Sequence, residues 1–263
     1  NVLSLFSGCG GMDLGFEGGF SVLEHSINEI LTPHFIDKKE RNGFVLLKKT
    51  KFKTVFANDI LSDARNAWVN YFSKKGHRVE DFYKESIVDL VKMYRSGVNV
   101  FPEKVDIVTG GFPCQDFSIA GKRNGFNSHK NHDGKLIEKE TASAETRGQL
   151  YMWMKEVIEI THELQPEFIV AENVKGLVNL GDVKSIIQND FSSANGNGYI
   201  VLEPQVFLSV FFVVLLSRER VIFIGIKKSA LKNSSLAELE KEIISEKYTP
   251  YPKPTHSYTV EGV

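Results

Sequence analysis

The chain has 263 residues, of which 42% are hydrophobic and 25% are charged. This composition excludes a disordered, collagen-like or coiled-coil protein, and the length suits one α/β domain with a large buried core. The 32 basic and 33 acidic residues give a formal net charge of -1. The protein as a whole therefore has no positive field that would indicate a nucleic-acid partner. Only a local basic face is compatible with this charge balance.

The cysteine count and the length of the apolar runs indicate the cellular compartment that we expect for this protein. Cys9 and Cys114 are the only cysteines, which excludes a disulfide framework and a cysteine-rich zinc site and favours a reduced, cytoplasmic protein without a metal centre. The longest apolar run, Val206 to Leu216, is far shorter than the roughly 20 residues that cross a bilayer, so we interpret it as a buried strand. We expect no secretory leader, and we expect trimming at the start because the initiator Met is missing.

Strand and helix patterns alternate through the first part of the chain. Val2 to Phe6 predicts a short strand that ends in a glycine-rich turn, and a helix from Met12 to Phe16 is closed by two glycines. Lys53 to Ala57 predicts a second strand, followed by a helix that carries Trp68. Val105 to Thr109 predicts a third strand, which stops at a Gly-Gly pair.

The second part begins with roughly thirty polar residues, Gln115 to Thr146, which we interpret as a functional or mobile loop without regular structure. The patterns that follow predict a helix, a strand, a helix and two strands that pair antiparallel, over residues 150–164, 168–171, 183–191, about 200–210 and 221–226. The alternation predicts an α/β fold with a doubly wound, mostly parallel sheet and an antiparallel edge strand pair. Ligands are then expected at the carboxyl ends of the strands.

The turn Ser7 to Gly11 joins the first strand to the first helix, in a pattern that nucleotide-binding proteins use. By itself it equally fits a structural tight turn. Asp59, after the second strand, is the acidic residue expected to hold ribose hydroxyls, although it lies further along than the ~20 positions usual after such glycines. An insertion around Leu31 to Lys51 explains the distance; the alternative is that Asp59 only caps a helix.

Two further segments place reactive groups at strand ends. Cys114 follows Pro113 at the end of the third strand, so its sulfur is expected to project into a crevice, where a thiol of pKa about 8.5 is already a few per cent nucleophilic thiolate. Glu172 and Asn173 follow a later strand, on the same rim of a parallel sheet. A carboxyl beside a thiol suggests acid assistance to a ring nitrogen, and a helix cap remains the alternative.

Five motifs follow one another in order over nearly the whole chain. They are Phe6-Ser7-Gly8-Cys9-Gly10-Gly11-Met12-Asp13, Pro113-Cys114-Gln115, Arg147-Gly148-Gln149-Leu150, Glu172-Asn173-Val174 and Arg218-Glu219-Arg220-Val221. Together they resemble the cytosine-5 DNA methyltransferase family. The resemblance implies a Rossmann-like fold, S-adenosylmethionine as the cofactor (leaving S-adenosylhomocysteine) and double-stranded DNA as the partner.

The resemblance gives each matched residue a chemical role. The enzyme extrudes a cytosine from the duplex, and Cys114 adds to carbon six of the ring, which makes carbon five reactive toward the methyl group. Glu172 holds or protonates the ring nitrogen. Arg220 contacts the ring oxygen and orients Glu172, and Arg218 supports the same site.

The resemblance also implies the cofactor contacts. Phe6 lies against the adenine or sulfonium side, Asp59 binds the ribose, and Ile60 packs on the adenine. The remaining positions are Gly8, Gly10 and Gly11 near the methionine moiety, and Pro113 and Leu150 lining the same cleft. In the polar loop, the resemblance implies contacts with phosphate or the flipped base from Ser118, Lys122 and Arg123.

Three departures from the family pattern stand out. Ser86 occupies the place of a common Asp that contacts the adenine amino group, and it accepts a hydrogen bond without charge assistance. Leu216 replaces a usual Gln, and the apolar residues 212–215 just before it replace a typical Tyr-Gly-Val-Pro. The family's target-recognition domain and its last two motifs have no counterpart, so residues 1–263 are expected to form one catalytic domain, the catalytic half of a longer or split enzyme.

The leading hypothesis is methylation of cytosine in DNA, in a bacterial restriction-modification or related system and acting at the nucleoid, with no membrane partner. One alternative is the related RNA cytosine-5 branch, which carries a Cys-Phe-Thr signature; it is disfavoured because Cys9 precedes Gly10 and Cys114 precedes Gln115. Another is a cofactor-binding subunit that is inactive without a partner chain, which the missing regions favour and the intact Cys114, Glu172 and Arg220 oppose.

Overall fold

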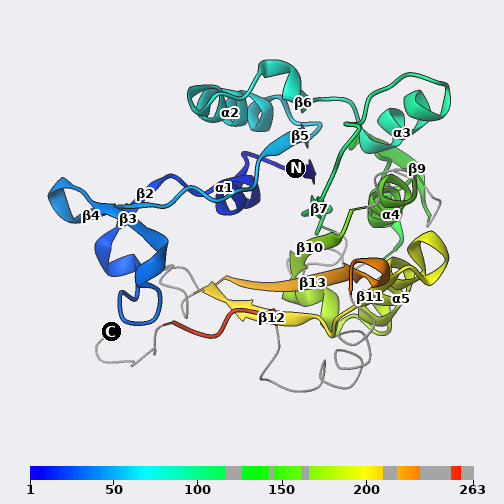
Figure 1. Ribbon diagram of the computed structural model, residues 1–263. Coiled ribbons are helices and arrows are strands. Elements are labelled where there is room, and N and C mark those ends of the chain that lie inside the picture. The colour runs from blue at the N-terminus through cyan, green and yellow to red at the C-terminus, as the bar shows by residue number, and fades with distance from the viewer. Residues whose placement is uncertain (116–125, 142–144, 161–165, 210–217, 232–249, 256–263) are drawn as a thin grey trace.

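The computed structural model describes residues 1–115, 126–141, 145–160, 166–209, 218–231 and 250–255. Its centre is an eight-stranded sheet in the order β11-β13-β10-β7-β1-β5-β6, with β12 paired to β13 (Figure 1). The strands are β1 Val2–Leu5, β5 Thr54–Asn58, β6 Phe82–Tyr83, β7 Ile107–Gly110, β10 Phe168–Val174, β11 Tyr199–Val201, β12 Gln205–Leu208 and β13 Glu219–Lys227.

The strand directions confirm the predicted fold class. β10, β7, β1, β5 and β6 pair in parallel, whereas β13 runs antiparallel to β10, β11 and β12. The central strands are buried along their length, as the all-buried β1 and β7 show, because helices cover a parallel sheet on both faces. β13 and its two short antiparallel partners, β11 and β12, form one edge of the sheet.

Helices pack on both faces of this sheet. Leu90, Met154 and Ile187, from α3, α4 and α5, share one buried cluster with Leu3 and Leu5 of β1. A second cluster joins aromatic side chains of α2 to β5 and β6 and includes Leu14 of α1. Figure 1 shows α3, α4 and α5 gathered together, away from α1 and α2. The bounds are α1 Gly11–Glu17, α2 Ser62–Phe72, α3 Ile87–Arg95, α4 Leu150–Ile160 and α5 Val183–Asn197.

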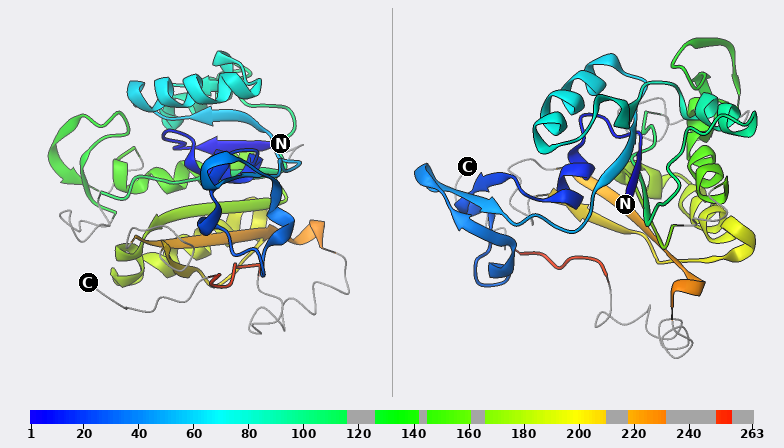
Figure 2. Two further views of the ribbon diagram at one scale, coloured as in Figure 1. Left: turned by 90° about the vertical axis from the view of Figure 1, so that its left-hand side faces the viewer. Right: turned by 45° about the horizontal axis from the view of Figure 1, so that its top comes forward.

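The insertion between α1 and β5 forms a small sheet of its own. β2 (Ser21–Leu23), β4 (Phe44–Leu47) and β3 (Ile36–Lys39) pair antiparallel in that order. Figures 1 and 2 show this sheet set apart from the central one. β3 and β4 lie within the segment 31–51 in which the sequence predicts an insertion, whereas β2 precedes it. β1 and β5 still pair directly beside each other.

The polar loop after Cys114 was expected to lack regular structure, and this prediction is wrong for part of it. β8 (Ser128–Lys130) and β9 (Leu136–Thr141) form an antiparallel hairpin, whose turn is closed by a bond from the Asn131 amide to the Lys135 carbonyl at 2.9 Å. Its polar side chains carry little of the apolar alternation that marks a strand. Ser118, Lys122 and Arg123 lie outside the described residues.

Two strand predictions are also corrected. Pro204 divides the strand expected at about 200–210 into β11 and β12, because proline has no amide proton for the ladder. The described part of the apolar run from Val206 is exposed or half-buried rather than buried, and Leu216 with residues 212–215 lies outside the described part. Within the described chain, no helix combines the length and apolarity needed to cross a bilayer.

Asp13 supplies a prediction about folding stability. Its carboxyl is fully buried and accepts a 2.7 Å hydrogen bond from Trp68 Nε1, and burial raises its pKa from 3.8 to about 6. The folded state therefore holds this proton more tightly than the unfolded state, so stability falls as pH rises from about 4 to above 6. A shift of this size is worth about 3 kcal/mol.

The Asp13→Asn variant keeps a side-chain acceptor for Trp68 and removes the titration. We expect the unfolding free energy of the variant minus that of the wild type to increase by about 3 kcal/mol between pH 4 and pH 8. Urea denaturation across this range measures the difference. Parallel stability profiles for the two proteins would contradict the expectation.

Candidate active site

A cavity of about 400 Å³ lies at the carboxyl ends of the parallel strands, where a doubly wound sheet binds its ligands. Phe6 follows β1, Asp59 follows β5 and Cys114 follows β7, so neighbouring strands deliver side chains to one place. The predicted site residues that line it are Phe6, Asp59, Ile60, Ser86, Pro113, Cys114, Leu150, Glu172, Arg218 and Arg220.

Cys114 is a free, half-buried thiol on the segment after β7. Asn173 holds this segment in place, because its Nδ2 donates a 3.0 Å hydrogen bond to the Phe112 carbonyl. Asn173 Oδ1 accepts from the Val174 amide at 2.9 Å. Asn173 is therefore a buried brace between β10 and the turn that carries Cys114.

Glu172 lies inside β10 rather than after it, which corrects the strand end predicted at Ala171. Parallel pairing with β7 ends at Gly110, opposite Ala171, but antiparallel pairing with β13 continues and places Glu172 opposite Ile222. A strand that reaches beyond its parallel neighbour holds its last side chains above the sheet rim. The carboxyl is thus fixed by a strand instead of a loop.

The Glu172 carboxylate binds the Arg220 guanidinium, with Oε1 2.5 Å from Nε. Arg220 faces Val174 across the strand pair, so it reaches Glu172 as a diagonal neighbour. Burial raises the pKa of Glu172 above its ordinary value, against the lowering effects of Arg220 and Arg218. A carboxyl with a raised pKa keeps its proton at higher pH, as a proton donor requires.

The carboxyl and the thiol come from adjacent segments. A Cβ atom placed on Gly111 would lie 3.4 Å from Glu172 Oε2, so the carboxyl lies against the turn that leads to Cys114. A second cavity of about 410 Å³ shares Phe6, Gly111, Glu172 and Arg218 with the first. It adds Ser7 from the glycine-rich turn and Met12 from α1.

The glycine-rich turn is bound to Asp59, a contact that sequence reasoning did not anticipate. The Gly8 amide donates to Asp59 Oδ2 at 3.0 Å, and Oδ1 accepts from the Leu61 amide at 2.9 Å. Leu61 itself is the residue before α2, so Asp59 does not cap that helix. Phe6 at the start of the turn has φ +53, a conformation that costs energy and that clusters at functional sites. Gly8, Gly10 and Gly11 line neither cavity.

Gly10 is required for packing. At φ +90, a Cβ on Gly10 would lie 2.4 Å from Phe72 Cε2 and 2.7 Å from Trp68 Cδ1. Gly10→Ala is therefore expected to lower the unfolding free energy by about 2 to 4 kcal/mol. Gly11→Ala is the matched control, because no atom lies within 4 Å of its added Cβ. Denaturant titration compares the two variants, and equal stabilities would contradict this interpretation.

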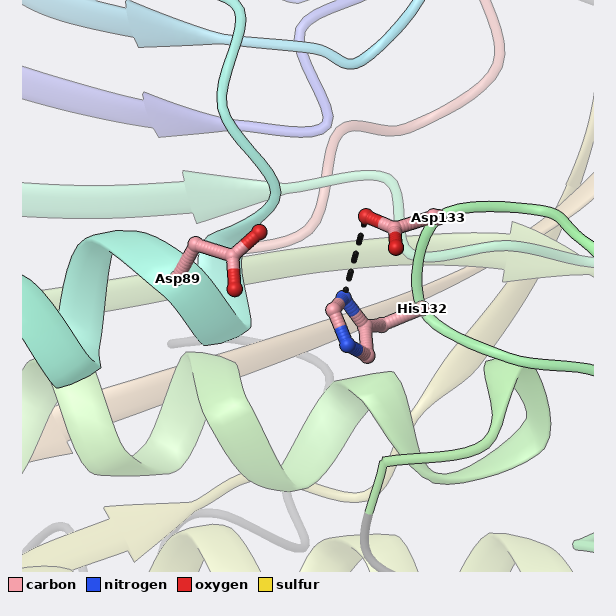
Figure 3. A group of neighbouring side chains, drawn as sticks. All are labelled: Asp89, His132 and Asp133. Carbon is pink, nitrogen blue, oxygen red and sulfur yellow. Dashed lines mark ion pairs between the residues drawn. The ribbon is translucent and has the colours of Figure 1, made fainter.

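Ser86 begins α3 and meets a residue that the sequence did not indicate. Its hydroxyl accepts from the Asp89 amide at 3.2 Å and donates to Asp89 Oδ2 at 3.0 Å, while His132 Nδ1 lies 2.8 Å from it. Asp89, His132 and Asp133 offer ligand atoms within 4.8 Å of one another (Figure 3). Since Ser86 already engages His132 Nδ1, we interpret this group as a hydrogen-bond network.

The comparisons with known proteins agree with this architecture. A solved Escherichia coli structure described as a prophage-encoded DNA modification methyltransferase shares the fold, with a TM-score of 0.51, 24% identity, and coverage of 88% of this chain and 47% of that one. The type II methyltransferase M.BsuRI of Bacillus subtilis is 35% identical over 259 residues, 97% of this chain and 46% of the relative. M.BspRI of Lysinibacillus sphaericus is 34% identical, and the match covers 91% of this chain and 47% of that relative.

The chain thus spans about half the length of these curated relatives. The model of the C-5 cytosine-specific DNA methylase family matches residues 42–261, which is most of the chain, and this range contains Cys114, Glu172 and Arg220. The chain therefore belongs to the C-5 cytosine-specific DNA methylase family.

Proposed function

We propose that residues 1–263 form the catalytic domain of an enzyme that transfers a methyl group from S-adenosylmethionine to carbon five of cytosine in DNA. The observation that carries this proposal is a single cavity lined by Cys114, Glu172 and Arg220 together with Phe6 and Asp59. Membership of the methylase family supports the reaction class, and the cavity supports the assignment of roles to these side chains.

The residues of the cavity fit an S-adenosyl cofactor. Phe6, Ile60 and Leu150 supply apolar surface for a purine and a methylene chain, and Asp59 supplies a carboxylate for hydroxyl groups. The cavity volume of about 400 Å³ lies within the range of small-molecule sites. When bound, the cofactor supplies an electrophilic methyl group. Phe6, Asp59 and Ile60 would hold the nucleoside of this cofactor.

The protein's own side chains perform the remaining chemistry in this proposal. The Cys114 thiolate forms a bond to carbon six of the extruded cytosine, and the electron pair of the 5,6 double bond becomes available at carbon five. Glu172 gives its proton to the ring nitrogen, which removes negative charge from the transition state. Arg220 holds the carboxyl in place. After methylation, the ring nitrogen returns its proton to the Glu172 carboxylate, and water takes the carbon-five proton. The electron pair of that C–H bond restores the 5,6 double bond as the Cys114 thiolate leaves.

Positive charge around the cavity supports a DNA substrate. Lys130, Arg147, Arg218 and Arg220 all line it, which supplies the local basic face that the near-neutral net charge allows. Cationic groups at this rim attract phosphates of the backbone. The relatives are type II methyltransferases, so we place this chain in a restriction-modification or related system.

Covalent trapping on DNA that contains 5-fluorocytosine tests the proposal. Fluorine at carbon five blocks the final elimination, so the protein stays attached through Cys114. A mispaired 5-fluorocytosine lowers the cost of extrusion, which is a few kcal/mol. We expect a denaturation-resistant adduct that requires the cofactor, with DNA and not with the equivalent RNA. Absence of the adduct despite cofactor binding would contradict methyl transfer by this chain alone.

The second candidate is a cofactor-binding subunit that becomes active only with a partner chain. The observation favouring it is that the chain spans about half of its relatives, so target recognition is proposed to come from sequence beyond the matched part or from another polypeptide. Trapping in the presence of the part of M.BsuRI that this chain does not match tests this candidate. An adduct that forms only in the mixture would favour it over the first.

A further inference from the structure

The hairpin β8–β9 brings a histidine into the cavity at the end where Ser86 lies. His132 lines the cavity, its side chain is 10% exposed, and its Nδ1 is 2.8 Å from Ser86 Oγ across 46 positions of sequence. Gly134 of the same turn approaches Ile60, since a Cβ on Gly134 would lie 4.0 Å from Ile60 Cδ1. The hairpin turn therefore contacts Ser86 and Ile60, the two residues that the resemblance to the family places at the adenine.

The hydrogen bonds of the Ser86 hydroxyl determine which ring nitrogen of His132 carries the proton. A hydroxyl has one proton and two lone pairs. The Ser86 proton goes to Asp89 Oδ2, and one lone pair accepts from the Asp89 amide. The second lone pair then accepts from His132 Nδ1–H, and Asp133 Oδ1, 3.3 Å from the same nitrogen, favours the same proton position (Figure 3). The one proton and both lone pairs of the Ser86 hydroxyl are thereby engaged in hydrogen bonds within the protein.

This tautomer leaves His132 Nε2 as the acceptor of a neutral imidazole. Glu145 Oε2 lies 3.6 Å from Nε2, beyond hydrogen-bond distance. Glu145 Oε1 instead binds Lys92 of α3 at 2.6 Å. Glu145, which follows the hairpin in sequence, is thus tied to α3, and the His132 ring is held between Ser86 and Asp133.

The order of strands decides which part of a cofactor lies beside His132. Cys114 follows β7 and Glu172 lies on β10, in the interior of the sheet, whereas Ser86 follows β6 at one edge. A methyl donor must point its reactive end toward carbon five of the base that Cys114 and Glu172 would hold. Its purine ring would then lie at the end of the cavity formed by Ile60, Ser86 and His132.

We propose that His132 is a specificity-determining residue of the cofactor site, whose Nε2 accepts a hydrogen bond from the 6-amino group of the bound adenine. Ser86 and Asp133 orient the ring, and the saturated Ser86 hydroxyl does not itself contact that group. The inference rests on the proposed function, because it requires that the cavity bind an S-adenosyl nucleoside.

Calorimetric binding of two ligands tests this inference without an activity assay. The ligands are S-adenosylhomocysteine and its analogue with hydrogen in place of the 6-amino group. We expect the wild type to prefer the amino compound about tenfold, because the analogue leaves Nε2 unpaired. His132→Ala is expected to bring the ratio close to one. His132→Gln, which can place an amide oxygen near the Nε2 position, is expected to restore part of it.

Lys135→Ala is the matched control, since Lys135 lies on the same turn with a 79% exposed side chain and does not line the cavity. It is expected to keep the wild-type ratio. If His132 served only to anchor the hairpin, His132→Ala would weaken the binding of both ligands equally. An unchanged ratio of the two affinities in His132→Ala would therefore overturn this inference and leave the proposed function standing. Failure of the wild type to bind S-adenosylhomocysteine would overturn the proposed function and this inference with it.

Discussion

Cys114→Ser is expected to lose the 5-fluorocytosine adduct and to lower methyl transfer by about 10⁴-fold or more, because the hydroxyl is a far weaker nucleophile than the thiolate. Cys114 is the half-buried cysteine of the cavity. The substitution changes one atom, so the affinity for S-adenosylhomocysteine should change only a few-fold. Quantitative adduct assays and calorimetry measure the two effects separately.

Cys9→Ser is the matched control for this prediction. Cys9 is the other free cysteine, it is exposed, and it lines neither cavity. Adduct formation and turnover should stay at the wild-type level. An adduct that persists in Cys114→Ser, or one that disappears in Cys9→Ser, would contradict the assignment of the nucleophile.

Glu172→Gln is expected to lower the methylation rate by about 10²–10⁴-fold, the usual contribution of a positioned acid. The amide keeps the size of the side chain and removes the transferable proton. In the wild type, burial holds the pKa of Glu172 above its ordinary value, so the protonated form is lost as pH rises through this raised pKa. The wild-type rate should therefore decline with pH along a limb that the variant lacks.

Glu219→Gln provides the comparison. Glu219 precedes Arg220 on β13 and binds Lys175 at 2.6 Å, but it does not line the cavity. Its loss is expected to leave the rate within about twofold, since a partly exposed ion pair contributes little. Rates measured from pH 5 to pH 9 distinguish the variants. A Glu172→Gln enzyme with the wild-type pH profile would remove Glu172 from the acid role.

Local patterns in the sequence were enough to predict the framework of this protein. Short apolar runs that end in glycine identified β1 and β7, and the motif around Cys114 identified a candidate nucleophile at a strand end, because strands and tight turns depend on residues close together in the chain. The same patterns underlie the predicted doubly wound sheet. Glu172 was also predicted at a strand end, whereas the role of Arg220 came only from the resemblance to the family, and their ion pair joins two strands far apart in the sequence.

Only the tertiary structure decided how distant segments meet. β10 extends through Glu172 because β13 pairs with it, Gly10 is required because α2 packs against it, and His132 belongs to the cavity because a polar hairpin folds back onto Ser86. None of these contacts leaves a periodic signal in one segment. Their free energy comes from pairing, packing and burial between elements, and therefore exists only once the chain has folded.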